Sequence, residues 1–549
     1  MKNILLTIFL GICVLAPICQ AQNAERLLLL ENFLEESVTE GIIPGGVFQV
    51  NLKGETIFRK TVGYIDVEKS RAYQEDDIFR IASMTKAFTS VAIMQLYENG
   101  QLLIDDRVSQ YIPAFADTKV MDEFDPTDST YTTKELERPI SIRHLLTHTS
   151  GIYYGAFMQN EFRAISIKNN AMNYGLSSPE ITTEQMVNHI ATLPLVHQPG
   201  SRWTYGLNME VLGYIIEVVS GQSLGEYIRE HITGPLGLDD TAFYFPESKA
   251  SRIVPVFMQV ESETKMNSDP NLEYPLAEFT HHYAGGGGMS STTSDYMRFI
   301  EALQYGGSID GVRILGRKTV EYMASQQTAH LTPDVKGSVR PKGSGFGLGF
   351  QVLTEESLGS TPMSPGTYSW GGYFNTKFWI DPVEQLSFVG MTQIVPFEHG
   401  RFWEELYAII YSSLDGDTAT KSKYFASESE GVRNTILDYV EGIYEVDSTR
   451  IEKSVHSQLR KRGYWYNADK EKYSDNLDMS FEQLRHLSAT WNINGKMVSE
   501  NSPKKIEIYD VNDRTASAKL TAEWGIDYFQ LAKLDGKWMI MNVLWQSLK

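Results

Sequence analysis

The sequence predicts a chain of two domains, each of which combines helices with antiparallel strands. At 549 residues the chain exceeds the size of one typical domain. In its first part, strand-like runs at 47–62, 343–353 and 367–392 surround several helical segments. After a polar stretch that ends at Gly431, helical segments precede four strand-like runs, which is typical of an α+β domain with a curved antiparallel sheet.

The composition limits the classes of partner. Hydrophobic residues make up 42% of the chain and charged residues 21%, as in globular proteins with a sizeable core. The formal net charge of −20 argues against nucleic acid or an anionic membrane surface as a partner.

Residues 1–21 are typical of a secretory signal peptide. Lys2 precedes an apolar run at 4–18, and we expect cleavage after Ala21. The run is too short and too lightly flanked for a membrane span. Both cysteines lie within residues 1–21, so the mature chain would have no disulfide, thiol nucleophile or cysteine metal site. We therefore expect export to the periplasm or the cell exterior; a lipid anchor at Cys19 is the weaker alternative, because the residues before it match that pattern poorly.

Periodicity and turn residues locate the first elements. Residues 23–39 predict an amphipathic helix, and Lys53–Gly54 predicts the turn of a β-hairpin. Apolar residues at helical spacing after Ser83 predict a helix that stops at Asn99–Gly100. Residues 117–137 are polar, acidic and without periodicity, which predicts a surface loop.

Two glycine-containing motifs each allow a functional and a structural interpretation. Residues 221–225 match G-x-S-x-G, the nucleophile elbow, but an elbow joins a strand to a helix. Here we expect one helix to end at Gly221 and Ser223 to begin the next, with Glu226 completing a capping box. Gly285–Gly288 could cradle a phosphate, but no Gly-Lys-Ser/Thr follows, so a tight backbone approach is the expected role.

The remaining elements complete the two domains. An irregular loop is expected at 256–283, a hairpin at 367–381 and 385–392, and a helix at 401–414. We assign 22–415 to the first domain, 416–431 to a polar linker and 432–549 to the second domain. In the second domain, helices are predicted at 432–444, 450–459 and 481–491, and strands at 505–511, 515–524, 526–533 and 538–545.

Ser83 and Lys86 form the motif that points to chemistry. Because the helical pattern begins after Ser83, Lys86 lies one turn on along the same face. A desolvated lysine can accept the serine proton, and the positive end of the helix dipole would stabilise an oxyanion. Taken alone, Ser-x-x-Lys also fits a capping serine followed by a surface lysine.

His144 and His148 stand four residues apart, as zinc ligands on a helix do. No glutamate occupies the position that a zinc protease helix needs. Structural histidines at a helix end are therefore expected, and neither a metal nor an organic cofactor is predicted.

Five blocks follow one another in an order that resembles a known superfamily. They are Ser83–Lys86, 142–151, 199–205, 285–289 with Asp295, and 370–372. This order resembles the serine β-lactamases, penicillin-binding proteins and family VIII carboxylesterases. The resemblance implies an antiparallel sheet flanked by helices plus an all-helical subdomain, and it makes Ser83 the expected nucleophile.

The resemblance also implies a role for each matching residue. Ser83 would attack the acyl carbonyl, and Lys86 and Tyr205 would share the general-base work. The backbone N–H groups of Ser83 and Tyr373 would form the oxyanion hole. The expected lining of the substrate pocket is Trp370, Gly371 and Gly372.

Two departures from the penicillin-recognising members favour the carboxylesterase branch. Class C enzymes have Asn two residues after the tyrosine, where this chain has Leu207, and Asn208 comes one residue later. In the penicillin-recognising members the strand motif begins with a cation that helps to hold a substrate carboxylate. This chain has Trp370 at that position. We therefore expect a hydrolase of acyl esters that forms a covalent acyl-enzyme and has weak or no β-lactamase activity.

The second domain carries a softer resemblance. The runs 437–444, 455–456, 460–463 and 538–545 resemble the NTF2-like superfamily, specifically members described as lumazine-binding. The resemblance implies an α+β cone that holds a pocket, and such cones serve binding or dimerisation.

Other functions stay open at this point. The same chemistry would suit a D-Ala-D-Ala carboxypeptidase, a D-aminopeptidase or a β-lactamase-type amide hydrolase, and Trp370 counts against these. A binding protein on a degenerate hydrolase scaffold is the third interpretation, against which the intact Ser83, Lys86 and Tyr205 argue. The expected partner is a small-molecule ester or acyl-peptide substrate. We expect no nucleic acid, no stable membrane span after signal cleavage, and dimerisation, if any, through the second domain.

Overall fold

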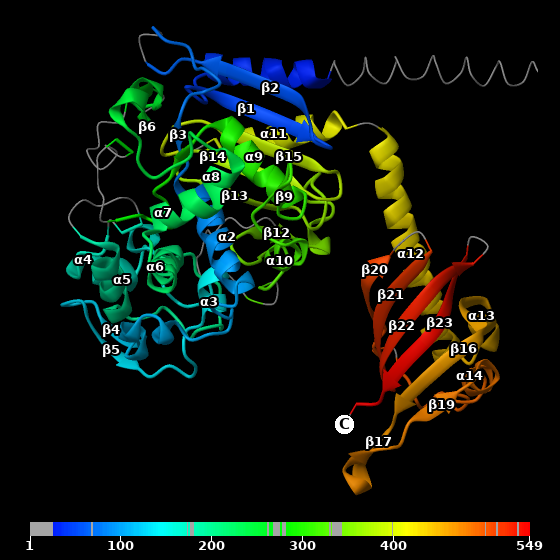
Figure 1. Cartoon of the computed structure of the whole chain (residues 1–549). Helices are drawn as coiled ribbons and strands as arrows, with labels where there is room; N and C mark the ends of the chain where they lie inside the picture. The colour runs from blue at the N-terminus through cyan, green and yellow to red at the C-terminus, as the bar shows by residue number, and fades with distance from the viewer. Residues whose placement is uncertain are drawn as a thin grey trace, which may run out of the picture. The chain divides into compact units, whose positions relative to one another are not determined.

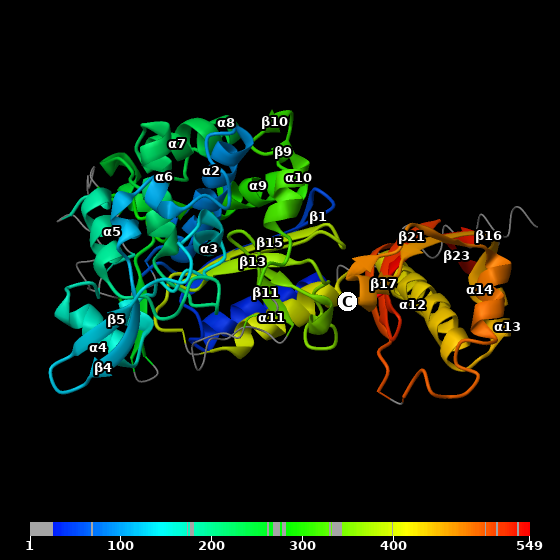
Figure 2. The same cartoon turned by 90° about the horizontal axis from the view of Figure 1, so that it is seen from below.

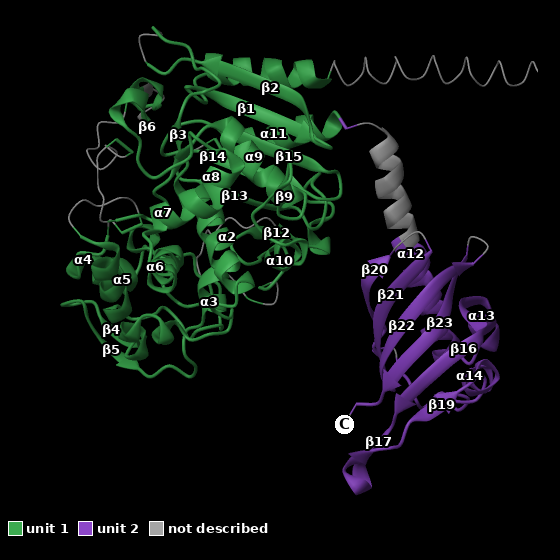
Figure 3. Cartoon of the chain, in the orientation of Figure 1, with its two compact units in different colours: residues 1–413 green, residues 414–549 purple. Residues whose placement is uncertain are grey.

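The chain forms two compact units, residues 1–413 and 414–549 (Figure 3). The computed structural model describes residues 26–548 apart from 67–69, 173, 176–180, 261–262, 267–274, 277–281, 329–330, 332–342, 398, 415, 500, 512–513 and 535–536. The predicted signal peptide lies outside the described residues. No helix in the described part is both long and apolar enough to cross a membrane.

An antiparallel sheet of seven strands forms the centre of the first unit (Figure 1). Its strand order is β11-β12-β13-β14-β15-β1-β2, so the first hairpin closes one edge. Lys53 and Gly54 both have positive φ angles, 52° and 84°, which confirms the predicted turn. The strands are β1 (Gly45–Leu52), β2 (Glu55–Gly63), β11 (Ser344–Phe346), β12 (Gln351–Leu353), β13 (Tyr368–Gly372), β14 (Thr376–Asp381) and β15 (Leu386–Met391).

The hairpin predicted at 367–392 is wrong in one respect, because its first run forms two strands. β13 ends at Gly372, the chain turns back, and β14 pairs with β13 so that Trp370 lies opposite Phe378. Asn375 adopts a left-handed φ of 64° in this turn. Asparagine tolerates that conformation. The residues on both sides of the turn are rich in strand-forming types, so Gly371–Gly372 was not interpreted as the start of a turn.

Helices cover both faces of this sheet (Figure 2). Side chains alternate along a strand, so neighbours on β14 face opposite sides. Trp379 packs edge-on against Tyr407 at a centroid distance of 4.9 Å. Phe378 packs against Tyr296 on the other face, at 5.2 Å. The first face carries α11 (Arg401–Ser412) and the helix at 26–39, and the other carries α9 (Thr293–Gln304).

A helical subdomain completes the unit, with α2 (Thr85–Glu98) buried along most of its length and packed on α6 (Asn208–Ser220). Gly221 ends α6 with a φ of 72°, and Ser223 caps α7 (Leu224–Ile228) in a capping box with Glu226, as predicted. The other helices are α3 (Ile142–Leu146), α4 (Glu161–Lys168), α5 (Thr183–Thr192), α8 (Gly234–Leu236) and α10 (Arg317–Met323). Short strand pairs are β3 (Phe79–Arg80) with β8 (Ser290–Ser291), and β9 (Ser308–Ile309) with β10 (Val312–Arg313).

Two predicted loops contain hairpins instead. The segment 117–137 holds β4 (Val120–Asp125) and β5 (Thr130–Lys134), and the segment 256–283 holds β6 (Phe257–Val260) and β7 (Glu263–Met266). Most side chains of β4 and β5 are exposed. A hairpin that is not packed on one face lacks the apolar alternation by which a strand is recognised.

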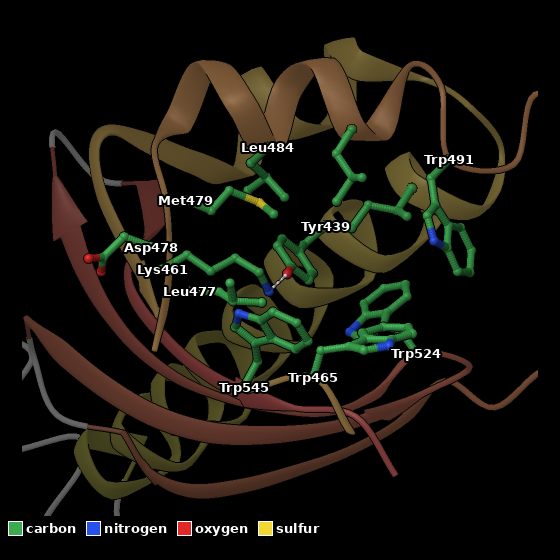
Figure 4. A pocket seen from close by; sticks show the side chains of 12 residues that line it. Tyr439, Lys461, Trp465, Leu477, Asp478, Met479, Leu484, Trp491, Trp524 and Trp545 are labelled. Atoms are coloured by element: carbon green, nitrogen blue, oxygen red, sulfur yellow. Dashed lines mark hydrogen bonds between the residues drawn. The ribbon is translucent and has the colours of Figure 1, made fainter. Parts of the chain in front are cut away.

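The second unit is a curved sheet of six strands with helices on one face (Figure 4). Its order is β19-β16-β23-β22-β21-β20, and β16 runs parallel to β23 while the other pairs are antiparallel. The strands are β16 (Val455–Tyr464), β19 (Leu477–Met479), β20 (Lys505–Val511), β21 (Thr515–Ala522), β22 (Gly525–Leu534) and β23 (Lys537–Gln546). The helices are α12 (Gly416–Tyr444), α13 (Ser448–Ser454) and α14 (Phe481–Ser488), and β17 (Tyr466–Asn467) pairs with β18 (Lys472–Tyr473).

Two boundaries here differ from the prediction. α12 begins at Gly416, inside the segment predicted as a linker, which is polar but contains no proline. The helix predicted at 450–459 ends at Ser454, and the chain continues as β16. Pairing with β23, which is distant in sequence, decides the conformation there, and local periodicity does not report such pairing.

Candidate active site

Ser83 lies in a 3₁₀ turn, Ala82–Met84, that leads directly into α2. Ala82 has a φ of 42°, a left-handed conformation that is uncommon for a residue with a side chain. Ser83 is partly exposed, whereas Lys86, one turn on, is only 1% exposed. The turn therefore presents the hydroxyl to solvent while the helix holds the amine in the interior.

The structure brings Ser83, Lys86 and Tyr205 together. The phenol of Tyr205 donates to Ser83 Oγ at 2.7 Å, and Lys86 Nζ lies 3.1 Å from the same oxygen. The Lys86 amine also donates to the carbonyl of Gly286 at 2.6 Å and contacts the Tyr154 hydroxyl at 3.2 Å. Ser83 Oγ thus sits between two groups that can exchange a proton with it.

Aromatic contacts fix the position of Tyr205. Its ring lies 5.4 Å from Trp370 and 5.2 Å from Tyr154, measured between centroids. Lys86 Nζ lies 4.9 Å from the centroid of the Tyr205 ring, a cation–π distance. Tyr205 follows the turn at Pro199–Gly200 and precedes α6, so it approaches Ser83 from the helical subdomain.

Two residues beside Lys86 were not predicted. Burial holds the pKa of Tyr154 well above its usual range, so its phenol stays protonated. Glu210, on α6, is fully buried and accepts the N–H of Gly286 at 2.9 Å. Burial raises the pKa of Glu210 to about 7, although the Lys86 charge acts in the opposite direction. A lone glutamate among the apolar residues of 209–216 was the available signal.

The glycine run makes a tight backbone approach, as predicted. A Cβ at Gly286 would lie 2.7 Å from the Glu210 carboxyl, 3.0 Å from the Tyr154 hydroxyl and 3.3 Å from Lys86 Nζ. Any side chain there would displace the groups that contact the amine. This place in the chain therefore requires glycine for packing against Lys86.

An open cleft of about 320 Å³ lies over Ser83. Tyr373 also lines it, half-exposed, in the turn that follows β13. A Cβ at Gly372 would lie 2.5 Å from the carbonyl oxygen of Ile81, so the end of β13 packs directly on the turn before Ser83. The oxyanion hole formed by the N–H groups of Ser83 and Tyr373 stays a prediction.

Comparison with known protein families shows to which family the chain belongs. The beta-lactamase family matches residues 30–410. The chain belongs to the beta-lactamase family. Residues 427–546 match a second family, described as "Putative lumazine-binding", so the NTF2-like assignment of the second unit is confirmed.

Several relatives are described as esterases or acyltransferases. A Mycobacterium tuberculosis protein is 32% identical over 376 residues, which cover 66% of this chain and 89% of that protein. Esterase EstB of Burkholderia gladioli is 27% identical over 379 residues, covering 66% of this chain and 89% of the esterase. The solved structure of EstCE1, a hydrolase with promiscuous acyltransferase activity, matches with a TM-score of 0.61 and 26% identity, covering 72% of this chain and 100% of that chain. The predicted fold is confirmed.

The cleft is apolar at the place where penicillin-recognising relatives are expected to carry a cation. Trp370 packs edge-on against Phe346, at 5.2 Å and 90°. Among the described residues that line the cleft, Lys377 is the one cation. Its amine lies over the rings of Trp403 and Tyr407, at 5.6 and 5.0 Å from their centroids, so aromatic rings engage its charge.

His144 and His148 do not share a helix face. His144 lies on α3, where its Nδ1 accepts the N–H of Ser141, and burial lowers its pKa to about 4. His148 follows the helix with a φ of 54°, and its Nδ1 lies 2.8 Å from the Asn208 amide nitrogen. Asn208 also bonds Ser150, so it does not stand in for the class C asparagine beside Ser83. In the described part of the chain, no three His, Cys, Asp or Glu side chains converge as metal ligands.

Proposed function

We propose that this chain is an exported serine hydrolase that cleaves a small ester through a covalent acyl-enzyme on Ser83. The convergence of the Tyr205 hydroxyl and the Lys86 amine on Ser83 Oγ, at 2.7 and 3.1 Å, carries the proposal. Relatedness to esterases supports the ester as substrate. Export rests on the signal-like composition of residues 1–21.

Acylation begins when Ser83 Oγ attacks the ester carbonyl carbon. The hydroxyl proton passes to the Tyr205–Lys86 pair, and the carbonyl oxygen becomes an oxyanion that the N–H groups of Ser83 and Tyr373 stabilise. The carbon–oxygen bond to the alcohol then breaks. Tyr205, whose hydroxyl already touches Oγ, returns the proton to the departing alkoxide, which leaves as an alcohol.

Deacylation repeats these steps with water as the nucleophile. Water loses a proton to the same pair, attacks the acyl carbon and releases a carboxylic acid, while Ser83 Oγ takes the proton back. An alcohol in place of water would yield a new ester. The open cleft and the likeness to EstCE1 favour such acyl transfer as a second activity.

The lining of the cleft favours neutral acyl groups over carboxylate-bearing substrates. Trp370 offers a ring where β-lactams and peptide C-termini would need a cation, and Lys377 is held over Trp403. We therefore expect esters to be better substrates than D-Ala-D-Ala peptides and β-lactams.

The test compares the mature protein and Ser83→Ala on short-chain p-nitrophenyl esters and, separately, on nitrocefin. We expect Ser83-dependent ester turnover, slow nitrocefin hydrolysis, and an acyl adduct on the Ser83 peptide by mass spectrometry. Fast nitrocefin turnover without ester turnover would contradict the choice of ester. Failure of a fluorophosphonate probe to label Ser83 would instead favour a non-catalytic binding protein.

A further inference from the structure

Two aromatic rings line the cleft over Ser83, one from the helical subdomain and one from the sheet. Phe157 ends a 3₁₀ turn, Gly155–Phe157, and Tyr373 lies in the turn between β13 and β14. The centroids of the two rings are 6.3 Å apart and their planes are tilted by 45°. The two parts of the first unit therefore meet through aromatic side chains beside the nucleophile.

Both rings are exposed to an extent that packing within the chain does not explain. Phe157 is 49% exposed, which makes it the most exposed phenylalanine among the described residues, and Tyr373 is 50% exposed. Removing apolar surface from water is favourable, so a substrate group that covers these rings gains from the contact. The place of this exposed pair, at the catalytic cleft, points to a role in substrate binding.

Phe157 also lies beside the proposed proton donor. Its ring is nearly parallel to that of Tyr205, at 19° and 6.2 Å between centroids, and the Tyr205 hydroxyl donates to Ser83 Oγ. In the proposed reaction this hydroxyl returns a proton to the departing alkoxide, so the alkoxide oxygen must come within hydrogen-bond reach of it. The group that this oxygen carries therefore lies on the Phe157 side of the cleft.

The charges around the cleft favour a neutral leaving group. No aspartate or glutamate occurs among the described residues that line it, so a cationic alcohol would find no carboxylate partner there. Lys377 would repel such an alcohol, since it is the cation of this lining. An anionic alcohol would have to draw the Lys377 amine away from the Tyr407 ring, whose centroid lies 5.0 Å from it.

We propose that Phe157 and Tyr373 select esters of neutral aromatic alcohols by packing against the ring of the leaving group. The inference rests on the proposed ester hydrolysis at Ser83 and adds the class of alcohol that is released. Aromatic rings favour edge-to-face and offset contacts with one another, and an aliphatic ring of similar size lacks the charge distribution for these contacts. Hydrolysis then yields a carboxylic acid and an aromatic alcohol, with water as the second reactant.

The test compares two esters of one acid, benzyl butyrate and cyclohexylmethyl butyrate, by titration of the butyric acid released. Their alcohols are neutral and similar in size and acidity, but only one has an aromatic ring. With the full-length mature protein we expect kcat/KM to favour the benzyl ester about threefold to tenfold. Phe157→Leu should lower this ratio to about one, whereas Phe157→Tyr keeps a ring and should retain the preference.

The matched control is Phe124→Leu, the same exchange at a half-buried phenylalanine of β4 that does not line the cleft. It should leave the ratio unchanged. Ethyl phenylacetate and ethyl cyclohexylacetate form a second pair, which carries the ring in the acyl part. Three results would overturn the proposal: a benzyl ratio near one in the wild type, a ratio that Phe157→Leu does not lower, or an aromatic preference confined to the second pair.

Failure of the proposed function gives a different result. Ser83-dependent turnover with a ratio near one overturns only the selection of aromatic alcohols. Absence of turnover of these esters and of p-nitrophenyl butyrate overturns the hydrolase instead, and binding then decides the selection. Saturation-transfer NMR on Ser83→Ala should show tighter binding of benzyl butyrate than of cyclohexylmethyl butyrate, and adding Phe157→Leu should remove the difference. Equal binding of the two esters to Ser83→Ala would overturn the selection as well.

Discussion

The hydroxyl of Tyr205 donates a 2.7 Å hydrogen bond to Oγ of Ser83, a residue 122 positions earlier in the chain. The serine comes from the start of α2 and the tyrosine from the loop before α6, two helices that pack on each other. Since Lys86, on α2, lies 3.1 Å from the same oxygen, the helix pair determines the geometry of proton transfer.

Tyr205→Phe should abolish most ester turnover while leaving the fold intact. The ring contacts with Trp370 and Tyr154 remain, but the proton donor to the leaving group is gone. We expect kcat/KM for p-nitrophenyl butyrate to fall by about 10²–10⁴. Tyr153→Phe is the control: this neighbour packs on Phe162 at 4.9 Å, away from Ser83, and should keep wild-type activity. An active Tyr205→Phe variant would show that Lys86 alone handles the proton.

Glu210→Gln should change how stability depends on pH. The folded-state pKa of about 7 is raised above the unfolded value near 4.5, so this carboxyl stabilises the fold fully below about pH 4.5. That contribution is lost as the pH rises through about 7. Glutamine has no charge to bury, so the variant should gain up to about 3 kcal/mol relative to wild type between pH 5 and pH 8. Thermal unfolding of both proteins at pH 5 and pH 8 measures the difference in stability between variant and wild type. An equal difference at the two pH values would contradict the prediction.

Gly372→Ala should harm the cleft more than Gly371→Ala. At Gly372 a Cβ would lie 2.1 Å from Thr376 Oγ1 and 2.5 Å from the Ile81 carbonyl, whereas at Gly371 the nearest atom is 3.3 Å away. Relieving the clash would push β13 away from the turn that holds Ser83. We expect a loss of about 1–3 kcal/mol of stability and a lower kcat for Gly372→Ala. Melting temperatures and ester kinetics for the two variants provide the comparison, and equal effects would count against this packing argument.

Asp527→Asn should strongly destabilise the second unit. It leaves the Lys461 ammonium buried without a carboxylate, which typically costs about 3–5 kcal/mol. Glu507→Gln breaks the ion pair with Lys519 on the same sheet, where both side chains are partly exposed, and should cost less than about 1 kcal/mol. Urea unfolding of the three proteins separates the cases. Replacing Lys461 and Asp527 together by Met and Leu should restore most of the loss.

The elements that the sequence located correctly are those with a local cause. The Lys53–Gly54 turn needs positive φ, and Gly221 ends a helix for the same reason. Prediction from the sequence failed where contacts between distant segments decide the secondary structure. The helix predicted at 450–459 included the first half of β16, whose conformation is decided by pairing with β23. The hairpin at 120–134 has too little burial to impose an alternating pattern.

By itself the sequence determined the two domains, their families, and the Ser83–Lys86 motif, because family blocks, turn residues and helical spacing are properties of neighbouring residues. Only the tertiary structure decided which side chains surround that motif. Tyr154 and Glu210 are separated from Lys86 by long stretches of chain, and no local pattern reports that burial would place them beside one amine. The same holds for the second unit, where Lys461 on β16 and Asp527 on β22 become a charge-compensated pair only because these strands lie on either side of β23 in the sheet.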